Sequence, residues 1–481
     1  MLEKRDRSQD ELFVACSLGD LIPEDYLLKR VDGVLDLSWL RGEVEELYCE
    51  DNGRPGIDPE AALRLMLAGF FHGIVHDRKL MREAQMHMGI RWFAGYRLHD
   101  SLPDHSSLTR LRQRWGVDRF RRIFDKTVNQ CVQAGLVSGK TVHIDATLIR
   151  ADVSWESLVE IHAQKVLEEN PVQPDGDCEP HTAPRKRGRP ATRPVSPKKR
   201  STTDPDATLA TSNKDHRMEP SYKQHTSVDD KAGVVVDAQV TTGEENEGLA
   251  MLEQLQRVEQ RLGHKPDTVT ADRSYAHSQN YDSLERQHIH AVIPPVSVGQ
   301  NGGSTLPLSR FKYDAHNQLV RCPAGKYLRR SCLSSNGWTY RARLADCRAC
   351  PLRKACFSPS SKSRKVNILH GYEALIRARR RHARRSREDV TVYQRHRWLV
   401  EGRHGEAKTC HGLARAIRRG LDNVQIQAYL TAAVMNLKRL ARFILPKNKS
   451  IVRLGELLRL LLEPTNYSQP NLVSSEKRTC V

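Results

Sequence analysis

The chain has 481 residues, and its 77 Lys and Arg residues against 58 Asp and Glu residues give a net charge of +19. This length exceeds one ordinary domain, so we expect about two to four folded units. A basic balance of this size favours a polyanionic partner, most commonly nucleic acid. No apolar run approaches the ~18 residues of a membrane span, which argues against a membrane protein.

The first residues, 1–13, carry acidic side chains and lack the apolar stretch of an export signal, so we expect a cytoplasmic protein. The 11 cysteines of such a chain favour reduced thiols or a metal site over a disulfide framework.

Residues 1–135 predict an all-α N-terminal domain. Asp58 is a good N-cap, Pro59 suits the first helical position, and an apolar stripe follows. Later helices are expected to begin at these residues: Asp77, Asp104 or Ser106, and Asp118. Basic outer faces favour sequence-specific DNA binding through a helix-turn-helix-like arrangement. The alternative is a helical bundle that serves packing or dimerisation.

The segment 136–165 contains TVHIDATLIRA, which predicts a β-strand over 141–151 with apolar residues at period two. Asp145 lies in the middle of this run. A carboxylate inside a central strand is costly unless something pairs with it, and a divalent metal is one such partner. A bond to the backbone or to an arginine is the alternative.

A helix is expected over 155–169, followed by a disordered basic, Pro-rich insertion over 166–220. Within it, four residues resemble the core of an AT-hook, which places arginines in a narrow minor groove. They are Arg187, Gly188, Arg189 and Pro190. A solvated basic linker that contacts phosphates is the alternative.

Residues 221–300 predict alternating elements, with Asp272 at the carboxyl end of a short strand. The expected elements are strands 222–229 and 233–242, helix 247–262 ended by Gly263, strand 267–275, helix 278–287 and strand 290–294. Together with the Asp145 strand, this order predicts an α/β, ribonuclease-H-like catalytic core. Ligand sites in such sheets lie at the carboxyl ends of strands.

Residues 301–366 form a Cys-rich insertion with a C-x-x-C pair and further cysteines, a pattern that suits tetrahedral structural zinc. The expected zinc ligands are Cys322, Cys347, Cys350 and Cys356, with Cys332 as a spare. Free cysteines in a loop are the alternative. This zinc would fold the insertion without entering catalysis.

Residues 367–445 predict the C-terminal helices of the core, and 446–481 a tail. Seven arginines lie within 375–387, a density that favours phosphate contact over a merely solvated face. Farther along, helical spacing places Arg397, Glu401 and Lys408 on one face, and Glu406 on another. An ordinary surface charge pair is the alternative reading of Glu401.

In this order, the motifs resemble those of bacterial insertion-sequence transposases of the DDE type, over residues 54–445. The spacing of Arg397, Glu401 and Lys408 matches the family signature, but Gln394 stands where the family has tyrosine, and Tyr393 lies one residue earlier. IDATLIRA and TADRSYA resemble the two aspartate motifs. GIDPEAALRLMLAGFFHGI, PDHSSLTRLRQRW and the Cys-rich insertion resemble one branch of the family.

The resemblance implies that Asp145, Asp272 and Glu401 hold two Mg²⁺ ions, for which Mn²⁺ can substitute, while Arg397 and Lys408 contact phosphate. It implies double-stranded DNA as partner, both terminal inverted repeats and target DNA. It also implies a homodimer or higher oligomer in the nucleoid of a bacterium. A catalytically inactive DNA-binding derivative and a ribonuclease-H-like nuclease without strand transfer are the alternatives, and a zinc-dependent regulator would leave the carboxylates unexplained.

Overall fold

The computed structural model describes residues 17–48, 56–160, 199–211, 217–296, 306–334 and 336–444. The AT-hook-like residues 187–190 and the tail expected after residue 446 lie outside these ranges. None of the helices within them combines the length and the apolar character needed to cross a bilayer.

The N-terminal part is helical, as expected. Its helices are α1 (Leu27–Asp32), α2 (Leu40–Val44), α3 (Pro59–Phe71), α4 (Asp77–Met86), α5 (Met88–Phe93) and α6 (His105–Gln133), with a 3-10 turn η1 (Glu45–Leu47). Asp58 caps α3 by accepting a hydrogen bond from the backbone N–H of Ala61, and Asp104 caps α6 through Ser106. Both caps confirm the sequence prediction.

Two predicted helix starts need correction. His76, not Asp77, is the N-cap of α4, because the Asp77 carboxylate is buried in ion pairs with Arg112 and Arg418. The third and fourth predicted helices form the single element α6, which is kinked at Gly116 (φ +67°, ψ 173°) ahead of Asp118. A side chain disfavours that conformation, so glycine permits the kink.

A mixed sheet forms the centre of the molecule. Its principal strands are β1 (Thr141–Arg150), β5 (Glu219–Asp229), β6 (Val235–Thr242), β7 (Thr268–Ala271) and β8 (His290–Val292). They lie in the order β6-β5-β1-β7-β8, with β5 antiparallel to both β1 and β6, and with β7 and β8 parallel to β1. The Asp145 strand is therefore the central member, flanked by β5 and β7.

The segment after β1 differs from the prediction. A 3-10 turn η2 (Trp155–Ser157) and the strand β2 (Leu158–Glu160) occupy the start of the expected helix 155–169, so that prediction is wrong there. The strands β3 (Lys199–Ser201) and β4 (Thr208–Ala210) lie inside the insertion that we expected to be disordered. β2, β3 and β4 add to the sheet beyond β5, a long-range pairing that local sequence does not reveal.

Four helices flank the sheet: α8 (Glu247–Leu262), α9 (Ser278–Arg286), α13 (Arg387–Cys410) and α14 (Leu421–Ile444). The predicted bounds of α8 are confirmed. Asn246 caps its start, and Gly263 ends it in the left-handed conformation (φ +77°). A short 3-10 turn, η3 (Arg273–Tyr275), follows β7 directly.

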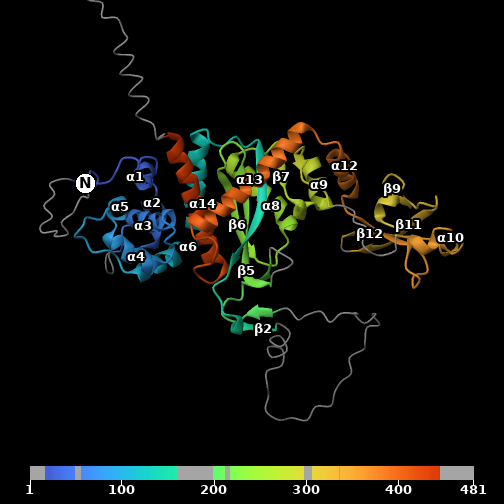
Figure 1. Ribbon diagram of the computed structural model, residues 1–481, viewed down its shortest axis with the longest axis horizontal. Coiled ribbons are helices and arrows are strands. Elements are labelled where there is room, and N and C mark those ends of the chain that lie inside the picture. The colour runs from blue at the N-terminus through green and yellow to red at the C-terminus, as the bar shows by residue number, and fades with distance from the viewer. Residues whose placement is uncertain are drawn as a thin grey trace, which may run out of the picture.

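The helix α14 lies between the N-terminal helices and the sheet (Figure 1). On one side, Tyr429 stacks on Phe124 of α6 at 5.6 Å. On the other, the buried Asn436 amide accepts a hydrogen bond from the backbone N–H of Val235 and donates one to its carbonyl. The helix α14 thus joins the N-terminal helices to the central sheet.

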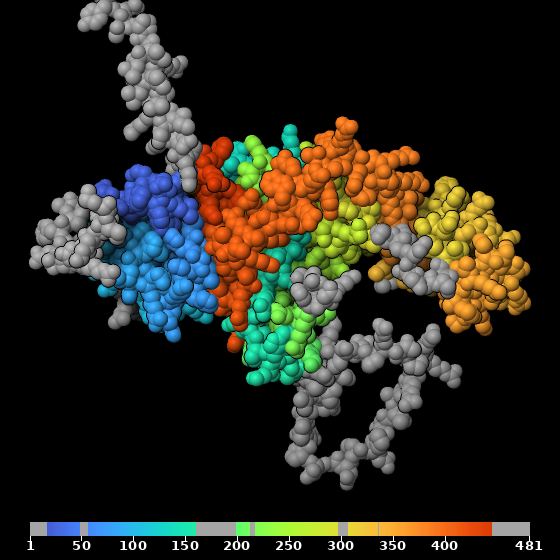
Figure 2. All heavy atoms as spheres, viewed as in Figure 1, coloured from blue at the N-terminus to red at the C-terminus, as the bar shows by residue number. Residues whose placement is uncertain are grey.

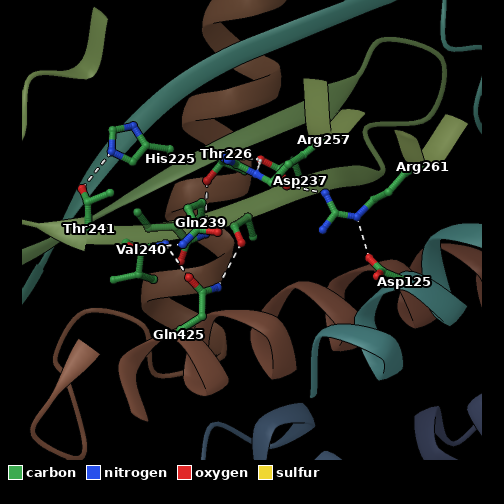
Figure 3. A network of polar contacts seen from close by, with 12 residues as sticks. Asp125, His225, Thr226, Asp237, Gln239, Val240, Thr241, Arg257, Arg261 and Gln425 are labelled. Atoms are coloured by element: carbon green, nitrogen blue, oxygen red, sulfur yellow. Dashed lines mark hydrogen bonds and ion pairs between the residues drawn. The ribbon is translucent and has the colours of Figure 1, made fainter. Parts of the chain in front are cut away.

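A polar network also links these parts (Figure 3). The buried carboxylate of Asp237 on β6 pairs with Arg257 and Arg261 of α8, and Arg261 reaches Asp125 of α6 at 2.5 Å. Gln425 of α14 bonds the backbone of β6 beside it. Because these charges are mutually paired, the attraction between them offsets part of the cost of their burial.

A second, smaller sheet lies at the far end of the molecule from the N-terminal helices (Figures 1 and 2). Its strands are β9 (Lys312–Asp314), β10 (Leu319–Arg321), β11 (Tyr327–Ser334), β12 (Gly337–Ala342) and β13 (Lys365–Leu369). The 3-10 turn η4 (Leu308–Arg310) precedes it, and the helices α10 (Leu344–Arg348) and α11 (Arg353–Cys356) lie between β12 and β13. The chain returns to the core through α12 (Tyr372–Ala383), which packs on α9.

Candidate active site

Asp145 lies in the middle of β1, opposite Thr226 of β5. Its side chain is 22% exposed, and the backbone N–H of Ala146 donates to it at 2.8 Å. Within the described residues no lysine or arginine forms an ion pair with it. The nearest base is the His404 ring, 3.7 Å away, and burial lowers the pKa of His404 to about 3, which leaves that ring neutral.

The environment of Asp145 is unusual for a carboxylate. Burial, together with the negative charges of Asp272, Glu247 and Glu401, raises its pKa to about 7, against the opposing effect of the Ala146 hydrogen bond. A carboxyl group in this state is stabilised by a cation that approaches it. The surroundings of Asp145 therefore favour binding of positive charge.

Asp272 follows β7 directly, at the end of the strand that runs parallel to β1. Its carboxylate accepts hydrogen bonds from the backbone N–H of Ser274 at 2.8 Å and from the Ser274 hydroxyl at 2.5 Å. Because Ile144 is paired with Ala271 in the sheet, Asp145 and Asp272 follow a pair of neighbouring residues. The two predicted aspartates therefore occupy neighbouring backbone positions.

Glu401 comes from α13, which crosses β1. Its side chain is 64% exposed and pairs with Arg397 one turn earlier at 3.4 Å. Lys408, farther along α13, is half-buried. Burial lowers the pKa of Lys408, while the negative charge of Asp145 opposes that shift. Glu401 and Lys408 thus act electrostatically on Asp145, and Glu401 lies on an exposed face of α13.

Glu406 lies in a different environment. It forms ion pairs with Lys438 and Arg439 of α14 at 2.7 Å each, and with Arg403 at 2.9 Å. Burial alone would raise its pKa, but His411, Lys438 and Arg403 outweigh that effect and lower the pKa to about 2. Glu406 is a structural anion that joins α13 to α14, and it points away from Asp145.

Tyr393 is the residue displaced by one position from the family signature. It stacks on His396 at 5.8 Å. Burial raises the pKa of Tyr393, and the charges of Asp272 and Asp145 raise it further. The phenol therefore lies near the two aspartates despite the shifted register.

Sequence reasoning missed Glu247, the first residue of α8. The Ser274 hydroxyl that contacts Asp272 also contacts Glu247, at 2.6 Å. A glutamate at a helix start is ordinarily explained by the helix dipole, so the sequence alone carried no signal for it. Only the proximity of α8 to η3 brings it to the site.

The carboxylates supply the oxygen ligands that Mg²⁺ prefers. Asp145, Asp272 and Glu401 come from three separate elements and act on one another electrostatically. In the described part of the chain, however, no three Asp, Glu, His or Cys side chains stand close enough to hold a metal ion in the present conformation. The three carboxylates therefore suit a divalent cation by the type of their ligand atoms and by their negative charge.

The four expected zinc ligands line one small cavity beside α10 and α11. Burial raises the pKa of the Cys356 thiol. Arg364 opposes this shift, and the Cys347, Cys350 and Cys322 thiols add to it. Cys332 lies exposed on β11, away from that cavity. All of these are free cysteines. Within the described residues, they too do not stand close enough together to hold a metal ion in the present conformation.

Two family models match separate parts of the chain. Residues 16–114 match one described as a transposase domain (DUF772), and residues 321–441 match one described as a transposase DDE domain. Together these matches support an insertion-sequence DDE transposase. In this transposase, the first match covers most of the N-terminal helices. The second covers the Cys-rich insertion from residue 321 onward, together with Glu401 and Lys408.

Among solved structures, the transposase is similar to a piggyBac transposase synaptic complex with hairpin DNA, at 12% identity and a TM-score of 0.32. The match covers 94% of this chain and 86% of that one. No match was found among curated proteins.

Proposed function

We propose that this transposase cuts DNA at the ends of its own element and joins the freed 3′ ends to target DNA, at a site formed by Asp145, Asp272 and Glu401. The observation that carries the proposal is the convergence of these carboxylates around Asp145, which no basic side chain of the described residues neutralises through an ion pair. A site that concentrates negative charge in this way requires cations to work on a phosphodiester.

The strand order supports a ribonuclease-H-like core. Three antiparallel strands, β6, β5 and β1, are followed by two that run parallel to β1, and the helix α8 connects β6 to β7. We propose this fold for the catalytic unit, with the division at residues 135, 165, 220, 300, 366 and 445 that the sequence predicts.

The chain's own groups would divide the chemistry as follows. Asp145 in β1, Asp272 directly after β7, and Glu401 on the exposed face of α13 would bind the cations. Lys408 and Arg397 contact the phosphate oxygens beside the scissile bond. Two Mg²⁺ ions, or Mn²⁺ in their place, would activate the attacking oxygen and stabilise the leaving oxygen.

Two displacements by the same geometry account for transposition. In the first, a water attacks the phosphorus at the element end, the P–O3′ bond breaks, and the element strand leaves with a 3′-hydroxyl. In the second, that hydroxyl attacks a target phosphodiester, forms a new P–O3′ bond and releases the target's own 3′-oxygen. Neither step needs a covalent enzyme intermediate.

The proposed partner is double-stranded DNA, both the terminal repeats and the target. The net charge of +19 suits it. The arginines of 375–387 lie on α12, in the loop that follows and at the start of α13, where Arg377 and Arg381 pair with Glu285 and the others would contact phosphate. Paired element ends would require a dimer or higher oligomer, acting in the cytoplasm at the nucleoid.

The test uses purified protein with a labelled duplex that carries the element's terminal repeat, in Mg²⁺ and in EDTA. We expect cutting at the element end only with Mg²⁺, abolished by Asp145→Asn and by Glu401→Gln while DNA binding persists. Two control variants on the same helix should still cut. Glu388→Gln replaces a matched exposed glutamate, and Glu406→Gln is assayed under conditions in which the variant is folded.

Each contrary result has a defined meaning. Cutting by Asp145→Asn would refute the assignment of the site. Specific binding without cutting in any metal would indicate an inactive DNA-binding derivative. Cutting without joining of the 3′ end to a target plasmid would indicate a nuclease.

A further inference from the structure

A fourth carboxylate lies beside the proposed triad. Glu247 is the first residue of α8, after the Asn246 cap, and its side chain is largely buried. The Ser274 hydroxyl lies 2.6 Å from one Glu247 oxygen and 2.5 Å from one Asp272 oxygen. A serine has a single hydroxyl hydrogen, so it cannot fully satisfy both carboxylates at once. Glu247 and Asp272 therefore share one donor at the edge of the site.

Glu247 is also coupled to Asp145. The charge of Glu247 raises the pKa of Asp145 more than the charge of Glu401 does. Because the interaction between charges weakens with separation and with exposure to water, Glu247 is the more closely coupled of the two glutamates. The anionic site around Asp145 is centred on Asp145, Asp272 and Glu247, with Glu401 on its open side.

A buried donor lies next to Ser274 in the chain. Tyr275, the last residue of η3, is 0% exposed, and its hydroxyl has no hydrogen-bond partner among the described residues. Burial raises the pKa of Tyr275 well above its ordinary value, and the charges of Asp145, Glu247 and Asp272 raise it further, so all three carboxylates act on this hydroxyl. Buried hydroxyls are ordinarily hydrogen-bonded, so this one is available to a ligand of the cluster.

The alternative role for Glu247 is structural. It pairs with Lys223 of β5 at 3.3 Å, and a carboxylate in the first turn of a helix is stabilising by itself. Neither contact explains why Glu247 shares Ser274 with Asp272, or why the buried Tyr275 hydroxyl beside Ser274 has no partner among the described residues. A role in the site accounts for all of these contacts together.

We propose that Glu247 is a further metal-binding carboxylate of this active site, which shares one divalent cation with Asp145 and Asp272 and leaves Glu401 to the second. This inference rests on the proposed function, whose triad it extends. Since the described side chains do not yet meet at metal-bonding distances, loading the site requires their rotation toward the cation.

The test measures Mn²⁺ binding to the full chain without DNA, through the loss of the free Mn²⁺ signal in electron paramagnetic resonance. We expect Glu247→Gln to weaken binding at one site by roughly 10-fold or more, comparable to Asp145→Asn, since loss of even supporting groups costs this much. Glu253→Gln, an exposed glutamate on the same helix, is the matched control and should bind as the wild type does.

A second variant separates the two roles of Glu247. Lys223→Met removes the ion pair but keeps the carboxylate, so it should retain Mn²⁺ binding. If Lys223→Met loses binding to the same extent as Glu247→Gln, or if Glu247→Gln binds Mn²⁺ as the wild type does, the inference is overturned. If Asp145→Asn also leaves binding unchanged, the proposed catalytic site itself fails, which distinguishes the two failures.

Discussion

Replacing Glu406 by glutamine tests whether the second glutamate of α13 is structural. In the folded protein its carboxylate contacts three cations of α13 and α14 and is 19% exposed. Glutamine keeps the size of the side chain and removes the charge. Arg403, Lys438 and Arg439 are then left close together without an anion, so we expect the variant to fold less stably but to keep the active site.

The magnitude follows from the pKa of Glu406, which is lowered from 4.5 to about 2. Since each pKa unit corresponds to about 1.4 kcal/mol, the ionised form contributes about 3 kcal/mol at neutral pH. A lowered carboxyl pKa stabilises the fold above the pKa of the unfolded chain. The difference between the two proteins should therefore be constant from pH 8 to 5 and shrink as the pH falls from 4.5 toward 2.

The assay is urea unfolding followed by circular dichroism at pH 7 and at lower pH, with Glu401→Gln as the matched control on the same helix. Because Glu401 is exposed and paired only with Arg397, its replacement should change stability by less than about 0.5 kcal/mol. If the free energy of unfolding of Glu406→Gln equals that of the wild type, the structural role of Glu406 is refuted. It is also refuted if Glu401→Gln, and not Glu406→Gln, lowers the free energy of unfolding.

Three further changes probe the rest of the fold. Asp237→Asn leaves Arg257 and Arg261 without their buried anion and should cost about 3–5 kcal/mol in urea unfolding, and a near-neutral effect would contradict the network. Asn436→Leu removes both hydrogen bonds to the backbone of β6 and should cost about 2–4 kcal/mol, unless the strand finds other partners. Cys350→Ser should abolish bound zinc, measured by elemental analysis, and leave DNA cutting intact; wild-type protein purified without zinc would rule out the zinc site.

The elements that the sequence predicted well carry their signals locally. α8 has a capping asparagine at one end and a left-handed glycine at the other, so its bounds follow from neighbouring residues alone. Asp145 was recognisable because a carboxylate inside an apolar strand is costly, and Asp272 because ligand sites lie at the carboxyl ends of strands. The strand pairing then brings them together.

The errors arose where distant residues decide the structure. Leu158 begins a strand because Ser201 pairs with it, although the local pattern favours a helix. Asp77 does not cap α4 because Arg112 and Arg418 take its carboxylate. Glu247 gave no signal, since only the fold brings Ser274 between it and Asp272. Tertiary partners overrule local preference in each case.

The position of α14 has a consequence for synthesis of the protein on the ribosome. The N-terminal helices end at Gln133, but the helix that covers α6 begins only at Leu421. At roughly 5–20 residues per second, the ribosome needs about 15–60 s to make the intervening chain. During that time the apolar surface of α6 that receives Tyr429 has no partner, so the first helices emerge early but complete their packing last.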